Sequence, residues 1–172
     1  MKHLILAATA SLLATPVMAG PLTGTFDSID GGTFAIEDWR GQPVLVVNTA
    51  SLCGFTHQYG ALQDLQDTYG EAGLVVVAVP SDDFRQELGS EEEVKDFCEV
   101  NFGLTIPMST ITRVRGRSAH PFYLALREAG FTPNWNFNKV LLDAEGQLVA
   151  TWRSTTSPLS PKITGEIEAL LN

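Results

Sequence analysis

The sequence predicts an α/β fold in which a central mixed β-sheet carries helices on both faces. Two unbroken apolar, β-branched segments, 43–48 (PVLVVN) and 74–79 (LVVVAV), are typical of strands buried on both faces. Helical patterns alternate with these strands, which is the order of an α/β chain. Residues 139–142 and 147–152, joined by the turn 143–146 (DAEG), indicate an antiparallel hairpin, so the sheet is expected to be mixed.

The other elements are predicted in chain order around these strands. Residues 33–36 form a short strand that runs into a turn before the first buried strand. Residues 56–70 form a helix, because apolar side chains recur there at three- and four-residue spacing: Leu62, Leu65 and Tyr69. A short helix at 120–128 ends before Gly130, and residues 161–171 form a closing helix.

An acidic helix is predicted to begin after Ser90. The serine hydroxyl is a good N-terminal cap, and the acids at 91–93 suit the positive end of the helix dipole. We expect one face of this helix to carry Val94, Phe97, Cys98 and Asn101.

The first 19 residues have the pattern of a secretory signal peptide. Lys2 gives a basic start, residues 4–13 (LILAATASLL) are apolar, and residues 17–19 (VMA) are the small residues that a signal peptidase recognises. The apolar run is about half the length that a membrane span needs. Cleavage after residue 19 would leave 172 − 19 = 153 residues, the single domain 20–172, exported and periplasmic in a bacterium.

The charge of the chain argues against polyanionic partners. The formal charge is −9, and it becomes −10 when Lys2 is removed with the leader. Nucleic acid and anionic lipid would both be repelled by such a surface. No segment after the leader is long and apolar enough to span a membrane, and no repeats are found.

Two cysteines are present, Cys53 and Cys98. In an exported chain, two cysteines most simply indicate one structural disulfide. The position of Cys53 favours another role, because it lies between the strand 43–48 and the helix 56–70, where the helix dipole stabilises a thiolate. Thr56 stands where a Cys-x-x-Cys disulfide exchanger has its second cysteine. The absence of a second cysteine at position 56 argues against a disulfide oxidoreductase or metallochaperone. It indicates that Cys53 is a nucleophile that attacks a peroxide O–O bond.

Metal ions and other cofactors are not expected. Two cysteines do not make a zinc site without further ligands, and the histidines of the mature chain, His57 and His120, have no ligand spacing. We expect His57 to be a solvated side chain in the first turn of its helix and His120 to be structural.

Several motifs, in order along the mature chain, carry a resemblance to a known family. They are 48–56 (NTASLCGFT), 86–87 (QE), 89–90 (GS), 119–121 (AHP) with Tyr123, 135–139 (WNFNK) and 155–158 (TTSP). Together they resemble the glutathione peroxidase family in its cysteine-containing, non-selenium bacterial form. The resemblance implies a thioredoxin-like fold and a thiol peroxidase that reduces hydrogen peroxide and organic hydroperoxides.

The resemblance also implies a four-residue catalytic site, carried here by Cys53, Gln86, Trp135 and Asn136. Indole and amide N–H groups directed at sulfur favour the thiolate and can stabilise the leaving oxygen. Trp39 and Trp152 are expected to be ordinary core aromatics.

One segment departs from the family pattern. The family usually has Pro-Cys-Asn-Gln-Phe-Gly before the glutamine, whereas this chain has 80–84 (PSDDF) followed directly by Arg85 and Gln86. One residue is missing, Ser81 replaces the usual cysteine, and Leu88 stands at a usual proline. A gap after Phe84 keeps Gln86 in register. Acids close to the thiol would raise its pKa and slow the reaction.

Two interpretations of Cys98 stay open. Its place on the acidic helix suits a buried, inert core cysteine. The resemblance implies that it resolves the Cys53 sulfenic acid to a disulfide, with local unwinding of the helix, and that a thioredoxin-like protein or glutathione then reduces this bond.

The segment 127–135 is short, and the resemblance implies that a member with such a short segment is a monomer. The alternative function is a non-catalytic binding or transport-accessory protein that keeps the fold.

Overall fold

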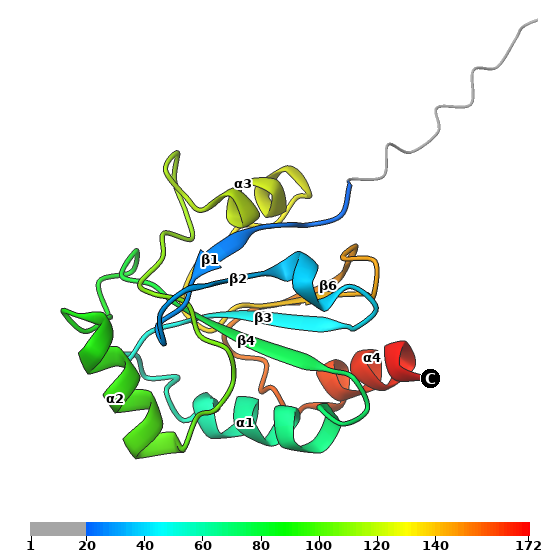
Figure 1. Cartoon of the computed structure of the whole chain (residues 1–172), viewed down its shortest axis with the longest axis horizontal. Helices are drawn as coiled ribbons and strands as arrows, with labels where there is room; N and C mark the ends of the chain where they lie inside the picture. Colours follow the sequence, from blue (N-terminus) through cyan, green and yellow to red (C-terminus); the bar gives the residue numbers. More distant parts are fainter. Residues whose placement is uncertain (1–19) are drawn as a thin grey trace, which may run out of the picture.

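A computed structural model describes residues 20–172, and its centre is a four-stranded mixed sheet of order β4-β3-β5-β6 (Figure 1). Strands β3 (Val44–Thr49) and β4 (Val75–Pro80) are parallel and buried at every residue. Strand β5 (Lys139–Leu142) is antiparallel to β3, and β6 (Leu148–Trp152) is antiparallel to β5. The predicted mixed sheet is confirmed. The predicted signal peptide lies outside the described residues.

The carboxyl ends of the two parallel strands lie at the same edge of the sheet. The register pairs Val44 with Val75 and Thr49 with Pro80. A proline has no N–H to donate, and Pro80 is accommodated because β4 is the outer strand of the sheet. The segments after β3 and β4 therefore emerge side by side, where open α/β sheets place their functional sites.

Helices cover both faces of the sheet, as predicted (Figure 1). Helices α1 (Gln58–Tyr69), α2 (Glu91–Phe102) and α4 (Pro161–Leu171) pack on one face. Helix α3 (Pro121–Glu128) packs on the other. Each face has its own apolar cluster, and the nucleophile candidate Cys53 belongs to the cluster beneath α1, α2 and α4.

A second, two-stranded sheet beside α3 was only partly predicted. It pairs β1 (Thr25–Asp27) with β2 (Thr33–Ala35), and the 3-10 helix η1 (Ile36–Trp39) follows at once. The predicted strand 33–36 is thus one residue shorter, and β1 was missed. A three-residue strand with one buried side chain, Phe26, has too little alternation to be recognised.

Helix α2 begins at the predicted serine cap, but its buried face is narrower than the predicted one. The Ser90 hydroxyl accepts a hydrogen bond from the Glu93 backbone at 3.3 Å, and Gly103 ends the helix with φ of 60°. Val94 and Cys98 are buried. Asn101 lies one turn after Phe97, as predicted, but it is exposed, and its side-chain amide donates to the Phe97 carbonyl at 2.7 Å.

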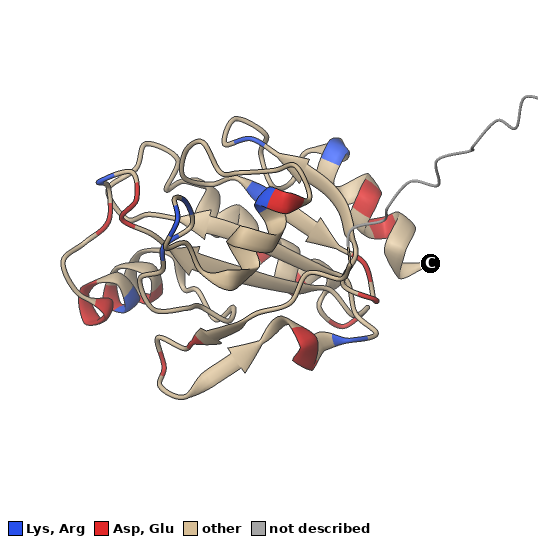
Figure 2. Ribbon diagram, turned by 90° about the horizontal axis from the view of Figure 1, so that it is seen from above, with Lys and Arg blue, Asp and Glu red and all other residues tan. Residues whose placement is uncertain are grey.

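Charged residues are spread over helices and loops around the sheet, and acids are interspersed with the fewer Lys and Arg residues (Figure 2). Within residues 20–172, no helix has the length and apolar character needed to cross a membrane.

Candidate active site

Cys53 lies in the turn between β3 and α1, at the carboxyl end of the parallel strands. Its side chain is 5% exposed and its thiol is free. Two hydrogen bonds tie the preceding residues to the segment after β4: Leu52 N–H donates to the Gln86 carbonyl at 2.8 Å, and Ser51 N–H donates to Glu87 Oε1 at 2.9 Å. The nucleophile loop and the 86–87 segment therefore form one hydrogen-bonded unit.

Gln86 and Asn136 are joined side chain to side chain. Asn136 Nδ2 donates to Gln86 Oε1 at 3.1 Å, and Asn136 is fully buried. Because the Gln86 oxygen accepts this bond, its NH₂ group points elsewhere, and the second N–H of Asn136 also stays available. The structure thus bonds the Gln86–Asn136 pair to the loop that carries Cys53, although Gln86 lies 33 residues after Cys53 and Asn136 lies 50 residues after Gln86.

Trp135 stands at the solvent side of this group, with 39% of its side chain exposed. Its ring lies 5.4 Å from the Phe84 ring, and the Arg115 guanidinium lies 5.3 Å above the centre of that ring. The other two tryptophans differ, because Trp39 and Trp152 are half-buried against the two core clusters. Trp135 is linked to the site through its sequence neighbour Asn136 and through Phe84.

A second layer of amides fixes the Trp135–Asn136 backbone. The Trp135 carbonyl accepts from Asn48 Nδ2 at 3.0 Å and from Asn138 Nδ2 at 2.9 Å. The Asn136 carbonyl accepts from the Ser154 hydroxyl at 2.5 Å. Since Asn48 belongs to β3, the strand that carries Cys53 also positions the tryptophan and asparagine of the site.

Lys139 is fully buried. Its ammonium donates to Gln58 Oε1, to the Thr156 carbonyl at 2.7 Å and to the Ser154 carbonyl at 3.3 Å. Burial lowers the pKa of Lys139 to about 7, and the three acceptors oppose the loss of its proton. From the sequence, Lys139 was placed at the start of a strand and at the end of the motif 135–139, without an assigned contact.

The shortened segment before Gln86 is closed by one residue in the left-handed region, Arg85, with φ of 57°. Its two acids serve backbone amides. Asp82 Oδ1 accepts from Glu87 N–H at 3.2 Å, and Asp83 Oδ2 accepts from the N–H groups of 114–115 at 2.6 and 2.9 Å. With this short segment, Gln86 is in contact with Asn136.

Cys98 is free and fully buried on α2, in the same apolar cluster as Cys53. Burial raises the pKa of its thiol to about 12. The nearby Tyr59 hydroxyl lowers this pKa, and the carboxylates of Glu87 and Glu99 raise it. In the reduced fold Cys98 is thus a protonated core thiol.

His57 and His120, the histidines within residues 20–172, occupy helix starts. His57 is exposed, with Nδ1 3.1 Å from the Gly54 carbonyl. His120 caps α3: its Nδ1 accepts from Phe122 N–H at 3.3 Å, and its Nε2 lies 2.8 Å from the Thr25 carbonyl. Burial lowers the pKa of His120, which suits this neutral, structural arrangement. Among residues 20–172, no three His, Cys, Asp or Glu side chains gather as metal ligands.

The fold places the chain among thioredoxin-like proteins. A thiol:disulfide interchange protein of the thioredoxin family from Chlorobium tepidum TLS superposes with a TM-score of 0.68, over 93% of this chain and 100% of that chain. The sequence identity is 15%, so this similarity defines the fold alone. The lone Cys53, without a cysteine at position 56, separates the present site from a Cys-x-x-Cys exchanger.

Sequence similarity identifies the family. The family profile described as "Glutathione peroxidase" matches residues 23–127. The glutathione peroxidase homolog BsaA of Halalkalibacterium halodurans is 42% identical over 149 residues, 83% of this chain and 94% of that protein. The hydroperoxy fatty acid reductase gpx1 of Synechocystis sp. is 37% identical over 159 residues, 84% of this chain and 92% of that protein. The chain belongs to the glutathione peroxidase family, and it is a thiol peroxidase.

Proposed function

We propose that Cys53 is the residue that reduces the peroxide. Its thiolate attacks one oxygen of the O–O bond, water or an alcohol leaves, and Cys53 becomes a sulfenic acid. The observation that carries this proposal is the Gln86–Asn136 amide pair, hydrogen-bonded at 3.1 Å and joined to the nucleophile loop through Leu52. The remaining N–H groups of this pair and the Trp135 indole are donors for a thiolate and for the departing oxygen.

The substrates are hydrogen peroxide and organic hydroperoxides. Apolar side chains flank the nucleophile at the surface, because Leu52 is 60% exposed and Trp135 is 39% exposed. Such a border favours the hydrocarbon part of an organic hydroperoxide, and the similarity to a hydroperoxy fatty acid reductase supports this substrate class.

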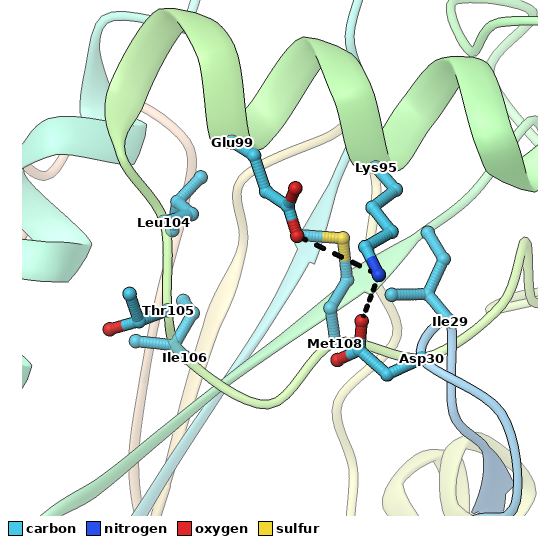
Figure 3. Close-up of a pocket in the computed structure, with 8 residues that line it drawn as sticks. All are labelled: Ile29, Asp30, Lys95, Glu99, Leu104, Thr105, Ile106 and Met108. Atoms are coloured by element: carbon cyan, nitrogen blue, oxygen red, sulfur yellow. Dashed lines mark ion pairs between the residues drawn. The ribbon is translucent and has the colours of Figure 1, made fainter.

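Cys98 resolves the sulfenic acid to a Cys53–Cys98 disulfide, and a thioredoxin-like protein or glutathione reduces that bond. Since Cys98 is fully buried, α2 has to shift for the sulfur atoms to meet. On one side Lys95 joins the helix to Asp30, with Nζ 2.6 Å from the carboxylate, beside a cavity of about 150 Å³ (Figure 3). Lys95 also lies 3.8 Å from Glu99 of the same helix. Exposed ion pairs of this kind are weak restraints, which permits the movement.

The peroxidase acts as an exported, periplasmic monomer. The basic, apolar and small-residue order of residues 1–19 supports export, and the acidic composition of the chain suits a protein that binds neither nucleic acid nor anionic lipid.

The test is peroxide consumption by the purified protein, with a thioredoxin system or glutathione as the reductant. The wild type should consume hydrogen peroxide and an organic hydroperoxide, and Cys53→Ser should abolish both reactions while it leaves the far-UV circular dichroism unchanged. A Cys53→Ser rate above a few per cent of the wild-type rate would refute the mechanism. A wild type that consumes no peroxide with either reductant would instead favour a non-catalytic binding protein.

A further inference from the structure

A buried polar network connects Lys139 with the residues that hold the site. Its ammonium donates to Gln58 Oε1, to the Thr156 carbonyl at 2.7 Å and to the Ser154 carbonyl at 3.3 Å. The side chain is 0% exposed, and within residues 20–172 no carboxylate forms an ion pair with it. A buried charge without a counter-ion is costly, and the strands of a core normally carry apolar side chains instead. The three bonds of this ammonium therefore call for an explanation beyond packing.

The first of these bonds reaches the helix that follows Cys53. Gln58 is the first residue of α1, and the turn before it is closed by a hydrogen bond of 3.1 Å from Thr56 N–H to the Cys53 carbonyl. The other end of the Gln58 amide, Nε2, donates to the Ser154 carbonyl at 2.7 Å. Lys139 and Gln58 thus share the Ser154 carbonyl, and together they attach the start of α1 to the segment after β6.

The other two bonds reach the segment that holds Asn136. The Ser154 hydroxyl donates to the Asn136 carbonyl at 2.5 Å and accepts from Asn138 Nδ2 at 3.1 Å. Asn136 in turn donates from its side chain to Gln86 Oε1 at 3.1 Å. A change in the position of residue 154 would therefore move the asparagine that is paired with Gln86.

Lys139 is thereby the charged group common to both sides of the site. It pairs with Val47 in the register of β5 and β3, and β3 continues into the loop that carries Cys53. From this place one ammonium bonds to the helix after Cys53 and to the residue that holds Asn136. Peroxide reduction requires these two sides to keep a fixed distance, because a displacement of about 1 Å between reacting and donating groups can cost about a hundredfold in rate.

We propose that Lys139 is a positioning residue for the oxidation of Cys53: its ammonium fixes the start of α1 to the 154–156 segment and so keeps Asn136 in place relative to the nucleophile. This inference rests on the proposed reduction of peroxide by Cys53. The hydrogen bonds of Lys139 end on Gln58 and on the 154–156 segment, so it acts on the reaction through these residues.

The experiment measures the oxidation of Cys53 by hydrogen peroxide in a single turnover without a reductant, at pH 6. Burial lowers the pKa of Lys139 to about 7, so its amine is mostly protonated at this pH. Lys139→Met keeps an unbranched side chain of similar length and removes the ammonium. Its second-order rate constant should be at least about tenfold lower than that of the wild type.

A double-mutant cycle distinguishes positioning from a general loss of stability. Ser154→Ala removes the hydroxyl that holds Asn136 and leaves the carbonyl that accepts from Lys139. If Lys139 acts through this segment, the two changes disturb the same contact, so the double variant should be at most about twofold slower than the slower single variant. The matched control is Leu142→Ala, which removes a buried apolar side chain of the same strand from the cluster on the α3 face and should keep the wild-type rate constant.

A smaller effect of Lys139→Met would overturn the inference, and so would single-variant slowing factors that multiply in the double variant. An equal slowing in Leu142→Ala would also overturn it, because loss of stability would then explain the result. If Lys139→Met does not fold, Gln58→Leu decides: it removes the amide that links the ammonium to α1, it should show the same slowing, and a smaller effect would refute the role of Lys139. A wild type that consumes no peroxide would refute the proposed function itself, whereas an active wild type with an equally active Lys139→Met refutes this inference alone.

Discussion

Replacing Lys139 by methionine removes a buried amine whose charge changes with pH. Burial lowers the pKa of this amine in the fold to about 7, and its ordinary value is 10.5. Between these two values the unfolded chain holds a proton that the folded chain has lost, so the free energy of unfolding rises with pH. The slope is about 1.4 kcal/mol per pH unit, which gives a gain of about 2 kcal/mol from pH 7 to pH 9. Below pH 7 both states are protonated and the slope vanishes.

The measurement is urea unfolding of the wild type and Lys139→Met at pH 6, 7, 8 and 9, followed by tryptophan fluorescence. The contributions of cysteines and tyrosines, which titrate in both proteins, cancel when one free energy of unfolding is subtracted from the other. This difference should be constant below pH 7 and then grow in favour of the wild type. Methionine also leaves three acceptors unpaired, the Gln58 amide oxygen and two backbone carbonyls, at a cost of about 1–3 kcal/mol each.

Lys162→Met, at an exposed position of α4, is the control and should show no pH-dependent difference from the wild type. A difference between the wild type and Lys139→Met that stays constant from pH 6 to 9 would refute the reasoning. It would mean that the three acceptors outweigh burial and keep the ammonium charged throughout.

Two further predictions concern the site and the core. Trp135→Phe and Asn136→Ala should each slow oxidation of Cys53 by about ten- to a thousandfold, the effect of losing one oriented donor; stopped-flow rates equal to wild type would assign the motif a structural role only. Cys98→Ser should lower the free energy of unfolding by about 1–2 kcal/mol, because it places a hydroxyl in an apolar core, and should stop turnover with thioredoxin after one cycle. Continued turnover with thioredoxin would make Cys98 a packing residue.

The long, strongly patterned elements could be predicted from the sequence. Strands β3 and β4 are unbroken apolar segments whose composition is decided by burial on both faces. The pair β1–β2 could not be predicted in full, because each strand has three residues and is stabilised by packing of Phe26 against distant rings such as Phe122 and His120.

The site was predicted where short motifs carry it. Cys53, Gln86 and Asn136 were named from the sequence, and the fold brings them together. The contributions of Lys139 and Glu87 were not found, because they depend on partners far away in the chain. Lys139 reaches Gln58 across 81 residues, and Glu87 reaches Ser51 across 36. No local pattern marks such pairs, although both residues lie within the motifs 86–87 and 135–139.

The link between the nucleophile loop and Gln86 has a consequence for how this loop can vary in length. The bonds that hold the site start at Gln86 and Glu87, downstream of Arg85, where a single left-handed residue closes the segment from β4. A change of length between Pro80 and Arg85 spares these bonds only if it keeps two contacts made from inside the segment. Asp82 Oδ1 accepts from Glu87 N–H at 3.2 Å, and the Phe84 ring lies 5.4 Å from the Trp135 ring.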